Sequence, residues 1–116
     1  MIENNYYTIK YTPFFNSELD EITKYIDCKL NNPNASKRLL QEIQKKIDNL
    51  KKMPKIYGML LDKIKSNNKW YKIKVKNYLI LYVIKGNFVI VFHIFYGKRN
   101  IQRLIDYYVD KTNFNY

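Results

Sequence analysis

The stretch WYKIKVKNYLILYVIKGNFVIVFHIFY, residues 70–96, decides the fold of this chain. At its start, lysines alternate with large apolar residues, and this period of two predicts a β-strand with one polar and one apolar face. The following runs, 78–84 and 88–96, are apolar at nearly every position, as is typical of strands buried on both faces. Lys85-Gly86-Asn87 predicts a tight turn between them. The stretch therefore predicts a three-stranded antiparallel meander.

Two amphipathic helices are predicted upstream of this meander. In the first, residues 15–30, apolar side chains recur at spacings of three and four, and Thr12-Pro13 supplies an N-cap and a first-turn proline. The second begins at Asn32-Pro33, carries an apolar stripe as far as Leu50 and ends at Met53-Pro54. Because the connection between them is short, the two helices are expected to form a hairpin.

The remaining segments complete one α+β domain that spans residues 1–116. Residues 6–11 alternate with period two and predict a first strand. Residues 100–110 have apolar side chains at helical spacing and predict a C-terminal helix, whereas residues 55–68 predict a loop with one helical turn. The order is then β-α-α-β-β-β-α, with the helical hairpin packed on one face of a small, mainly antiparallel sheet.

The composition predicts a cytoplasmic protein. The single cysteine, Cys28, cannot form an internal disulfide, which favours a reducing compartment. Since Cys28 falls in a helical pattern, we expect a buried and inert thiol. No secretory signal is visible, and the longest apolar run, residues 88–96, is too short to cross a bilayer. No membrane association is therefore expected.

The distribution of charge indicates an anionic partner. The formal net charge is +11, and residues 62–99 carry nine basic groups and one acidic group, Asp62. A concentration of cations in one region is the pattern expected of a surface that binds a polyanion. The alternative is compositional, because an AT-rich genome raises the lysine content everywhere. That alternative accounts for part of the excess but leaves the near absence of acidic residues in this region unexplained.

The usual catalytic constellations are missing from the sequence. It holds no cluster of histidine, cysteine and carboxylate residues, no phosphate-binding P-loop and no Gly-x-Gly-x-x-Gly motif, so we expect neither a metal nor a cofactor. The one histidine, His93, lies inside an apolar strand, where a core or half-buried position is the expectation.

Cationic side chains are the remaining candidates for a site. Lys72, Lys74 and Lys76 alternate behind Trp70, so all four side chains are expected on one face of a strand. Clustered cations stabilise the charge that develops in phosphodiester cleavage, and a crowded lysine can take part in proton transfer. The alternative is a lysine-coated sheet face that carries no chemistry.

A second cationic group follows the last predicted strand. Gly97-Lys98-Arg99 and then Arg103 contain two of the three arginines of a chain that otherwise uses lysine. Arginine holds a phosphate or carboxylate through two parallel hydrogen bonds, which lysine cannot do. The alternative is a turn followed by a positively charged helix start.

Taken in order, these features resemble the RelE/ParE superfamily of type II toxins. The resemblance extends over residues 6–105. It rests on the turn Asn32-Pro33-Asn34-Ala35-Ser36, the helix exit Leu50…Met53-Pro54, and the runs 70–75, 77–82 and 89–92 with Gly97-Lys98-Arg99. It implies a microbial-ribonuclease-like sheet and a toxin without metal or cofactor, neutralised by an antitoxin through an acidic or amphipathic segment. One branch of the superfamily cleaves mRNA in the ribosome, and the other inhibits DNA gyrase.

The residues of the mRNA-cleaving branch carry over in part. Lys72 and Lys74 stand at its strand lysines, and Arg99 stands at its arginine after the last strand, so the resemblance assigns these three to catalysis. Leu79 stands where that branch has arginine, and Ile105 stands where it has a catalytic tyrosine. Nucleic-acid contacts are expected from Trp70, Lys76, Lys98 and Arg103, and Tyr107 or Tyr108 is the alternative late base.

Three functions are therefore considered. In the first, the chain cleaves mRNA on the ribosome: Lys72 and Lys74 bind the scissile phosphate and assist proton transfer, Arg99 stabilises the developing charge, and the 2′-hydroxyl is the nucleophile. The second is inhibition of DNA gyrase without nuclease activity, a branch that the long helical hairpin resembles. The third is a non-toxic RNA-binding or degenerate toxin domain.

Overall fold

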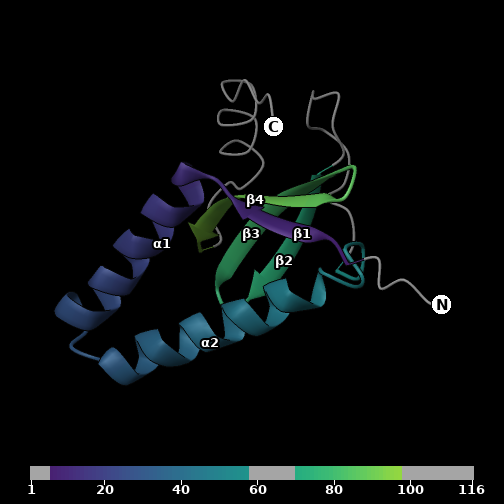
Figure 1. The fold of residues 1–116 in the computed structure, drawn as a ribbon. Helices are drawn as coiled ribbons and strands as arrows, with labels where there is room; N and C mark the ends of the chain where they lie inside the picture. Colours follow the sequence, from purple (N-terminus) through teal and green to yellow (C-terminus); the bar gives the residue numbers. More distant parts are fainter. Residues whose placement is uncertain (1–5, 58–69, 98–116) are drawn as a thin grey trace.

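The computed structural model describes residues 6–57 and 70–97 and confirms the α+β architecture (Figure 1). Helices α1 and α2 form a hairpin beside a four-stranded sheet of order β1-β4-β3-β2, in which β1 runs parallel to β4 and the other pairs are antiparallel. Helix α1 continues into a π-helical segment, η1. The bounds are β1 Thr8–Tyr11, α1 Pro13–Lys24, η1 Tyr25–Lys29, α2 Pro33–Asn49, β2 Trp70–Val75, β3 Tyr78–Lys85 and β4 Phe88–Tyr96.

The helices begin where the caps in the sequence predict. The Thr12 hydroxyl accepts a hydrogen bond from the backbone N–H of Phe15 at 3.1 Å, and the Asn32 side chain accepts one from Ala35 N–H at 3.2 Å. Each cap satisfies a backbone donor that the first helical turn leaves without an intrahelical acceptor. Asn31 adopts a left-handed φ of 48°, which lets the chain reverse between the helices. The predicted helical hairpin is therefore confirmed.

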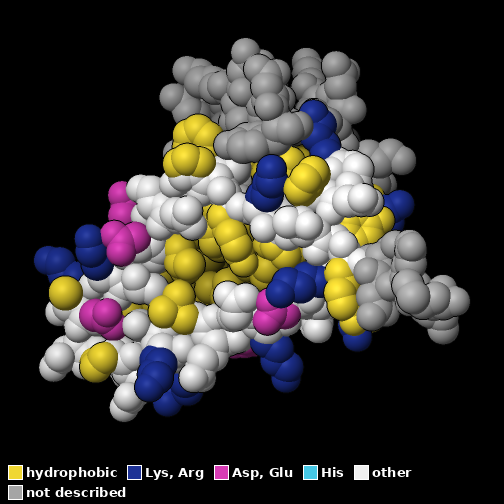
Figure 2. All heavy atoms as spheres, viewed as in Figure 1, with side chains coloured by type: hydrophobic (Ala, Val, Ile, Leu, Met, Phe, Trp, Pro, Cys, Tyr) yellow, Lys and Arg dark blue, Asp and Glu magenta, His cyan; other side chains and the backbone are white. Residues whose placement is uncertain are grey.

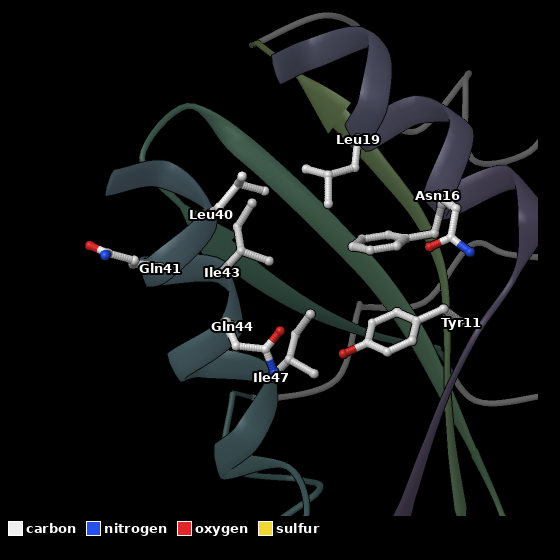
Figure 3. Close-up of a pocket in the computed structure, with 9 residues that line it drawn as sticks. Tyr11, Asn16, Leu19, Leu40, Gln41, Ile43, Gln44 and Ile47 are labelled. Carbon is white, nitrogen blue, oxygen red and sulfur yellow. The ribbon is translucent and has the colours of Figure 1, made fainter. Parts of the chain in front are cut away.

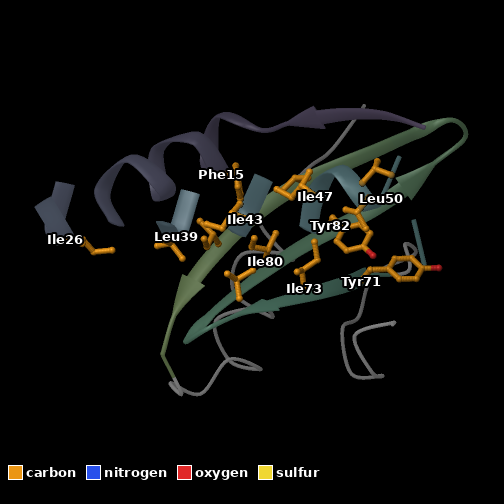
Figure 4. Packing of buried hydrophobic residues seen from close by; sticks show 14 residues of the cluster. Phe15, Ile26, Leu39, Ile43, Ile47, Leu50, Tyr71, Ile73, Ile80 and Tyr82 are labelled. Carbon is orange, nitrogen blue, oxygen red and sulfur yellow. The ribbon is translucent and has the colours of Figure 1, made fainter. Parts of the chain in front are cut away.

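Both helices cover the same face of the sheet (Figure 4). The apolar stripe of α2, which runs through Leu39, Ile43 and Ile47, packs on Ile73 of β2 and Ile80 of β3. Burial of these side chains is the main force that attaches the hairpin to the sheet, at roughly 1.5–3 kcal/mol for each large aliphatic side chain.

A buried tyrosine attaches the segment after α2 to strand β3. The Tyr82 hydroxyl donates a 2.6 Å hydrogen bond to the carbonyl oxygen of Pro54. Burial, and then the nearby phenols of Tyr71 and Tyr57, raise the pKa of Tyr82 well above its ordinary value. The phenol is therefore held in its neutral, donating form.

We expect Tyr82→Phe to lower the free energy of unfolding by about 1–2 kcal/mol, because the buried Pro54 carbonyl loses its donor. Urea denaturation measures this loss, with Tyr57→Phe as the control because the Tyr57 hydroxyl lies in an exposed contact with Asn49. The folded-state pKa is raised, so the parent should lose stability as the pH rises above the unfolded tyrosine value of about 10. A Tyr82→Phe variant as stable as the Tyr57→Phe variant would contradict this role.

A β-bulge in β4 changes which side chains face the helices. Leu81 pairs with His93 and Tyr82 pairs with Val91, so Phe92 is the extra residue. Val91 before the bulge and Ile94 after it both belong to the core under the helices. Since a shift of one residue exchanges the faces of a strand, the bulge keeps apolar side chains on both faces of β4.

The opposite face of the sheet carries a second apolar cluster, made of Trp70, Leu81, Val83, Ile90 and Phe92. The Trp70 ring packs edge-on against Phe92, with 5.2 Å between centroids, and only 2% of Trp70 is exposed. The prediction that Trp70 is an exposed contact for nucleic acid is therefore wrong. Trp70 does follow the alternation of the strand, but apolar neighbours from β3 and β4 bury it.

Beyond the last residue of β1, the N-cap residue Thr12 and helix α1 provide the hydrogen-bond partners of β4. Beyond the end of β1, Thr12 N–H donates to Val91 O at 3.0 Å, and the Thr12 hydroxyl donates to Phe92 O at 2.7 Å. The Glu18 carboxylate accepts from Ile94 N–H and from His93 Nδ1, each at 3.0 Å. His93 is buried, with 1% exposed, as its place in an apolar strand predicts. Thr12 and Glu18 thus satisfy the backbone of β4 around the bulge.

Two other expectations differ from the structure, and several fall outside it. Cys28 is exposed on η1 and not buried, because the helix stripe that packs on the sheet passes through Ile26 instead. The first strand is shorter than predicted and begins at Thr8. The expected loop over residues 58–68 and the expected helix over residues 100–110 lie outside the described residues. Within 6–57 and 70–97, no helix is both long and apolar enough to cross a membrane.

Candidate functional site

Strand β2 presents the two lysines that the sequence singled out. Lys72 and Lys74 are exposed, while Tyr71, Ile73 and Val75, which alternate with them, are buried under the helices. The two side chains leave the sheet on the same face, from backbone positions about 7 Å apart along the strand. In the described part of the chain, neither lysine has a carboxylate within ion-pair distance. The predicted alternation of Lys72 and Lys74 is confirmed, and the pair forms a local concentration of positive charge.

A third cation reaches the same strand from α2. Lys46 Nζ donates a 2.7 Å hydrogen bond to the carbonyl oxygen of Lys74. Since β2 is the edge strand of the sheet, this bond occupies an acceptor on its outer side. Sequence reasoning missed Lys46, because it lies 28 residues before Lys74 and looks like an ordinary lysine on the polar side of a helix.

Two other predicted members of the site, Lys76 and Trp70, do not join this pair. Lys76 leaves the alternation, because β2 ends at Val75 and Lys76 sits in a tight turn with a left-handed φ of 52°. Trp70 is buried, as described above. The end of β4 does reach this turn, since Gly97 N–H donates to Asn77 O at 2.8 Å. The predicted residues Lys98, Arg99, Arg103, Tyr107 and Tyr108 lie outside the described residues.

The cross-strand neighbours of the two lysines are apolar. Lys72 pairs with Leu81 and Lys74 pairs with Leu79. His93 follows Leu81 across the sheet, but its ring is buried between Phe14 and Phe95, with 5.4 Å between centroids on each side. The surface around the lysine pair can therefore attract anions, but none of these neighbours is placed to transfer a proton.

Two tyrosines lie at the end of the sheet near the β2–β3 turn. Tyr78 and Tyr96 are paired in register, with 5.1 Å between their ring centroids. Burial, and then the neighbouring phenol of Tyr96, raise the pKa of Tyr78 above its ordinary value. Tyr78 packs against the core under the helices, whereas Lys72 and Lys74 project from the other face. This phenol is thus on the wrong face to act together with the lysine pair.

A groove between α1, α2 and β1 is the second candidate site (Figure 3). Its volume is about 420 Å³, and Figure 2 shows apolar side chains gathered in this hollow with charged ones around it. Leu19 of α1 and Leu40 of α2 point toward each other, and the Tyr11 hydroxyl points across toward α2. Leu40 and Tyr11 are 39% and 38% exposed. The groove lining is Tyr11, Phe15, Asn16, Leu19, Leu40, Gln41, Ile43, Gln44 and Ile47.

The groove was not expected, because its residues read from the sequence as the buried stripes of two helices. The two helices diverge from their connection (Figure 1), so the α2 stripe is only partly covered. Burial raises the pKa of the Tyr11 phenol, and the Asp48 carboxylate adds to this effect. The groove therefore combines an apolar floor with neutral polar groups, which is the character of a surface that buries a peptide or helix.

A family model and one solved structure agree with this fold. A family model described as the ParE toxin of the type II toxin–antitoxin system, parDE, matches residues 9–101. A chain of the chromosomal ParDE TA system from P. aeruginosa superposes with a TM-score of 0.65 at 14% identity, covering 81% of this chain and 99% of that one. A chain of the RelB-RelE antitoxin-toxin complex from Methanococcus jannaschii gives a TM-score of 0.41 at 22% identity, covering 85% of this chain and 98% of that one. A search of curated protein sequences gives no match.

Proposed function

Because the chain belongs to the ParE toxin family of type II toxin–antitoxin systems, we propose that it inhibits growth by binding DNA gyrase. The observation that carries this proposal is the surface of β2, where Lys72 and Lys74 are exposed opposite Leu81 and Leu79. Leu81 is buried and Leu79 is half-buried, so this surface offers mainly positive charge, which suits attachment to an acidic protein patch.

The same surface favours binding over cleavage. Cleavage of a phosphodiester by an adjacent 2′-hydroxyl needs one group that takes the proton of the nucleophile and another that protonates the leaving oxygen. The cross-strand partners of Lys72 and Lys74 are leucines, and Tyr78 lies on the opposite face. The described sheet therefore supports the attraction of an anionic surface better than it supports acid–base chemistry.

Supercoiling by purified DNA gyrase tests the proposal. The full-length chain is expected to block supercoiling of relaxed plasmid, and Lys72→Ala/Lys74→Ala should require a concentration about 10- to 30-fold higher, at about 1 kcal/mol for each lost charge contact. Lys37→Ala, an exposed lysine on α2, is the control and should inhibit as the parent does. Supercoiling that is unaffected by an excess of the parent chain would refute a gyrase target.

Cleavage of mRNA on the ribosome is the second candidate, and one observation favours it. Lys46, Lys72 and Lys74 bring three cations to one edge strand, as a surface that follows a phosphate backbone would require. The test is an in vitro translation reaction in which the mRNA is analysed after the toxin is added. Cleaved mRNA at toxin levels that leave supercoiling intact would establish this function in place of gyrase inhibition.

We further propose that the apolar groove between α1 and α2 binds the antitoxin. The family pairs each toxin with an antitoxin, and the groove is an apolar recess of about 420 Å³ on the surface of the described residues. An amphipathic segment could bury its apolar side chains against Leu19 and Leu40 and present acidic side chains to a chain of net charge +11. Neutralisation would then use a different surface from the lysine pair on β2.

A further inference from the structure

Two exposed aromatic rings at the β1 end of the sheet are each accompanied by a lysine. Lys10 Nζ lies over the Phe88 ring at 4.3 Å from the centroid, and Lys52 Nζ lies over the Tyr6 ring at 5.4 Å. Phe88 is 40% exposed and Tyr6 is 49% exposed. Aromatic side chains as exposed as these bury little of their apolar surface. Their position beside lysines therefore suits a ligand that stacks on the face of a ring.

Backbone hydrogen bonds hold the two ring–lysine pairs together. Tyr7 N–H donates to Lys51 O at 2.8 Å, which ties the end of the α2 segment to the start of β1. Thr8 N–H donates to Asn87 O at 2.8 Å, and Thr8 pairs with Phe88 in register. Tyr6 is two residues before Thr8, so its backbone lies about 8 Å from that of Phe88. The backbones of the two ring-bearing residues therefore lie close together at one end of the sheet.

The charge of this surface is positive. Lys10 and Lys52 have no carboxylate within ion-pair distance among the residues that the structure describes. Lys85 stands opposite Phe88 in register. The nearby Asp48 carboxylate is engaged by Lys51 at 3.5 Å. In Figure 2, lysine and apolar side chains lie next to one another over β1 and its surroundings.

We propose that Tyr6, Lys10, Lys52 and Phe88 form a binding site for single-stranded nucleic acid. Unpaired bases stack on the two rings, and the lysine ammonium groups pair with the phosphates between them. Exposed aromatic side chains interleaved with cations are how proteins bind single strands without reading sequence. An acidic protein segment would use the lysines but would leave the rings without a stacking partner.

This site is separate from the surface assigned above to the toxin target. Lys72 and Lys74 lie on β2, and β1 is the opposite edge of the sheet, three strand spacings or about 14 Å away. Nucleic-acid binding at β1 would hold the toxin near its target whether that target is gyrase on DNA or mRNA on the ribosome. The inference therefore does not depend on which of the two proposed targets is correct.

Binding of the full-length chain to a fluorescently labelled RNA of about 12 nucleotides tests the site by anisotropy, with a DNA strand of the same sequence and a duplex as further probes. Phe88→Ala and Tyr6→Ala should each weaken single-strand binding roughly tenfold and leave its salt dependence unchanged. Lys10→Gln and Lys52→Gln should each make the dependence of log K on log salt shallower by about 0.7. Tyr25→Ala and Lys37→Gln, both exposed and remote from β1, are the matched controls.

Two further variants, Phe88→Leu and Tyr6→Leu, keep a large apolar side chain at each position. They test whether weaker binding comes from the loss of the ring and not from unfolding. They should bind as weakly as the alanine variants, because they lack a ring face. Ring variants that bind single strands as the parent does would overturn the site, as would a duplex that binds as tightly as the single strand. Displacement of the RNA by polyglutamate at equal charge concentration would also overturn it and would indicate an acidic protein as the partner. A failure of the gyrase assay remains distinguishable from a failure of this site, because oligonucleotide binding is measured without gyrase.

Discussion

Leu40→Glu is expected to release the toxin from its antitoxin without disturbing the fold. Leu40 lines the groove but is 39% exposed, so the folded chain tolerates a carboxylate there. When a partner covers the groove, the same carboxylate is buried in an apolar setting that also holds Leu19 and Ile43. A buried charge without a partner costs several kcal/mol, so we expect the antitoxin to bind at least about 100-fold more weakly.

Growth of cells that co-express the two proteins measures this effect. The antitoxin to use is the short acidic protein that we expect the adjacent reading frame to encode. Leu30→Glu is the matched control, because Leu30 is 56% exposed at the end of η1 and does not line the groove. Cells with the parent or with Leu30→Glu should grow, and cells with Leu40→Glu should stop growing. If the Leu40→Glu toxin copurifies with the antitoxin as the parent does, the groove is not the antitoxin site.

Glu18→Ala is expected to lower the free energy of unfolding by about 3 kcal/mol, which corresponds to a fall in Tm of roughly 10 °C. Its carboxylate accepts hydrogen bonds from Ile94 N–H and from the buried His93 ring, at the point where β1 no longer covers β4. Removing it takes the acceptor away from two donors that water reaches poorly. Hydrogen bonds to a charged acceptor are also the stronger kind.

Urea and thermal denaturation test this role. Glu21→Ala, an exposed carboxylate on the same helix, controls for the loss of a negative charge and should change the stability by less than about 0.5 kcal/mol. Glu18→Gln keeps one oxygen acceptor, so its free energy of unfolding should lie between those of Glu18→Ala and Glu21→Ala. A Glu18→Ala variant as stable as Glu21→Ala would show that the Glu18 carboxylate does not help to hold α1 on β4.

The predicted elements that the structure confirms are those built from local interactions. Thr12 caps α1 through a residue three positions on, and Asn32 does the same for α2. The three strands of the meander are joined by two-residue turns, so their antiparallel pairing follows from the chain itself. The alternation of Lys72 and Lys74 on an exposed face is local for the same reason.

The candidate site was predicted less completely, and the reasons are physical. Alternation places Trp70 on the face of Lys72, but whether a side chain on that face is buried depends on what packs beside it, here Phe92. The prediction that Lys76 shares the face of Lys72 and Lys74 is wrong because the strand ends one residue before it. The groove and the ring–lysine pairs join residues from α1, α2, β1 and β4, and no pattern within one element reveals such meetings.

By itself, therefore, the sequence determined the order of the elements, the helix caps, the meander and the concentration of positive charge. Only the tertiary structure decided that β1 runs parallel to β4, that a bulge at Phe92 exchanges the faces of that strand, and that Thr12 and Glu18 satisfy it. The first set arises from contacts over a few residues, which local geometry dictates. Apart from the bulge between the neighbouring strands β3 and β4, the second set depends on residues 75 to 80 positions apart, and these meet only when burial of the whole core brings them together.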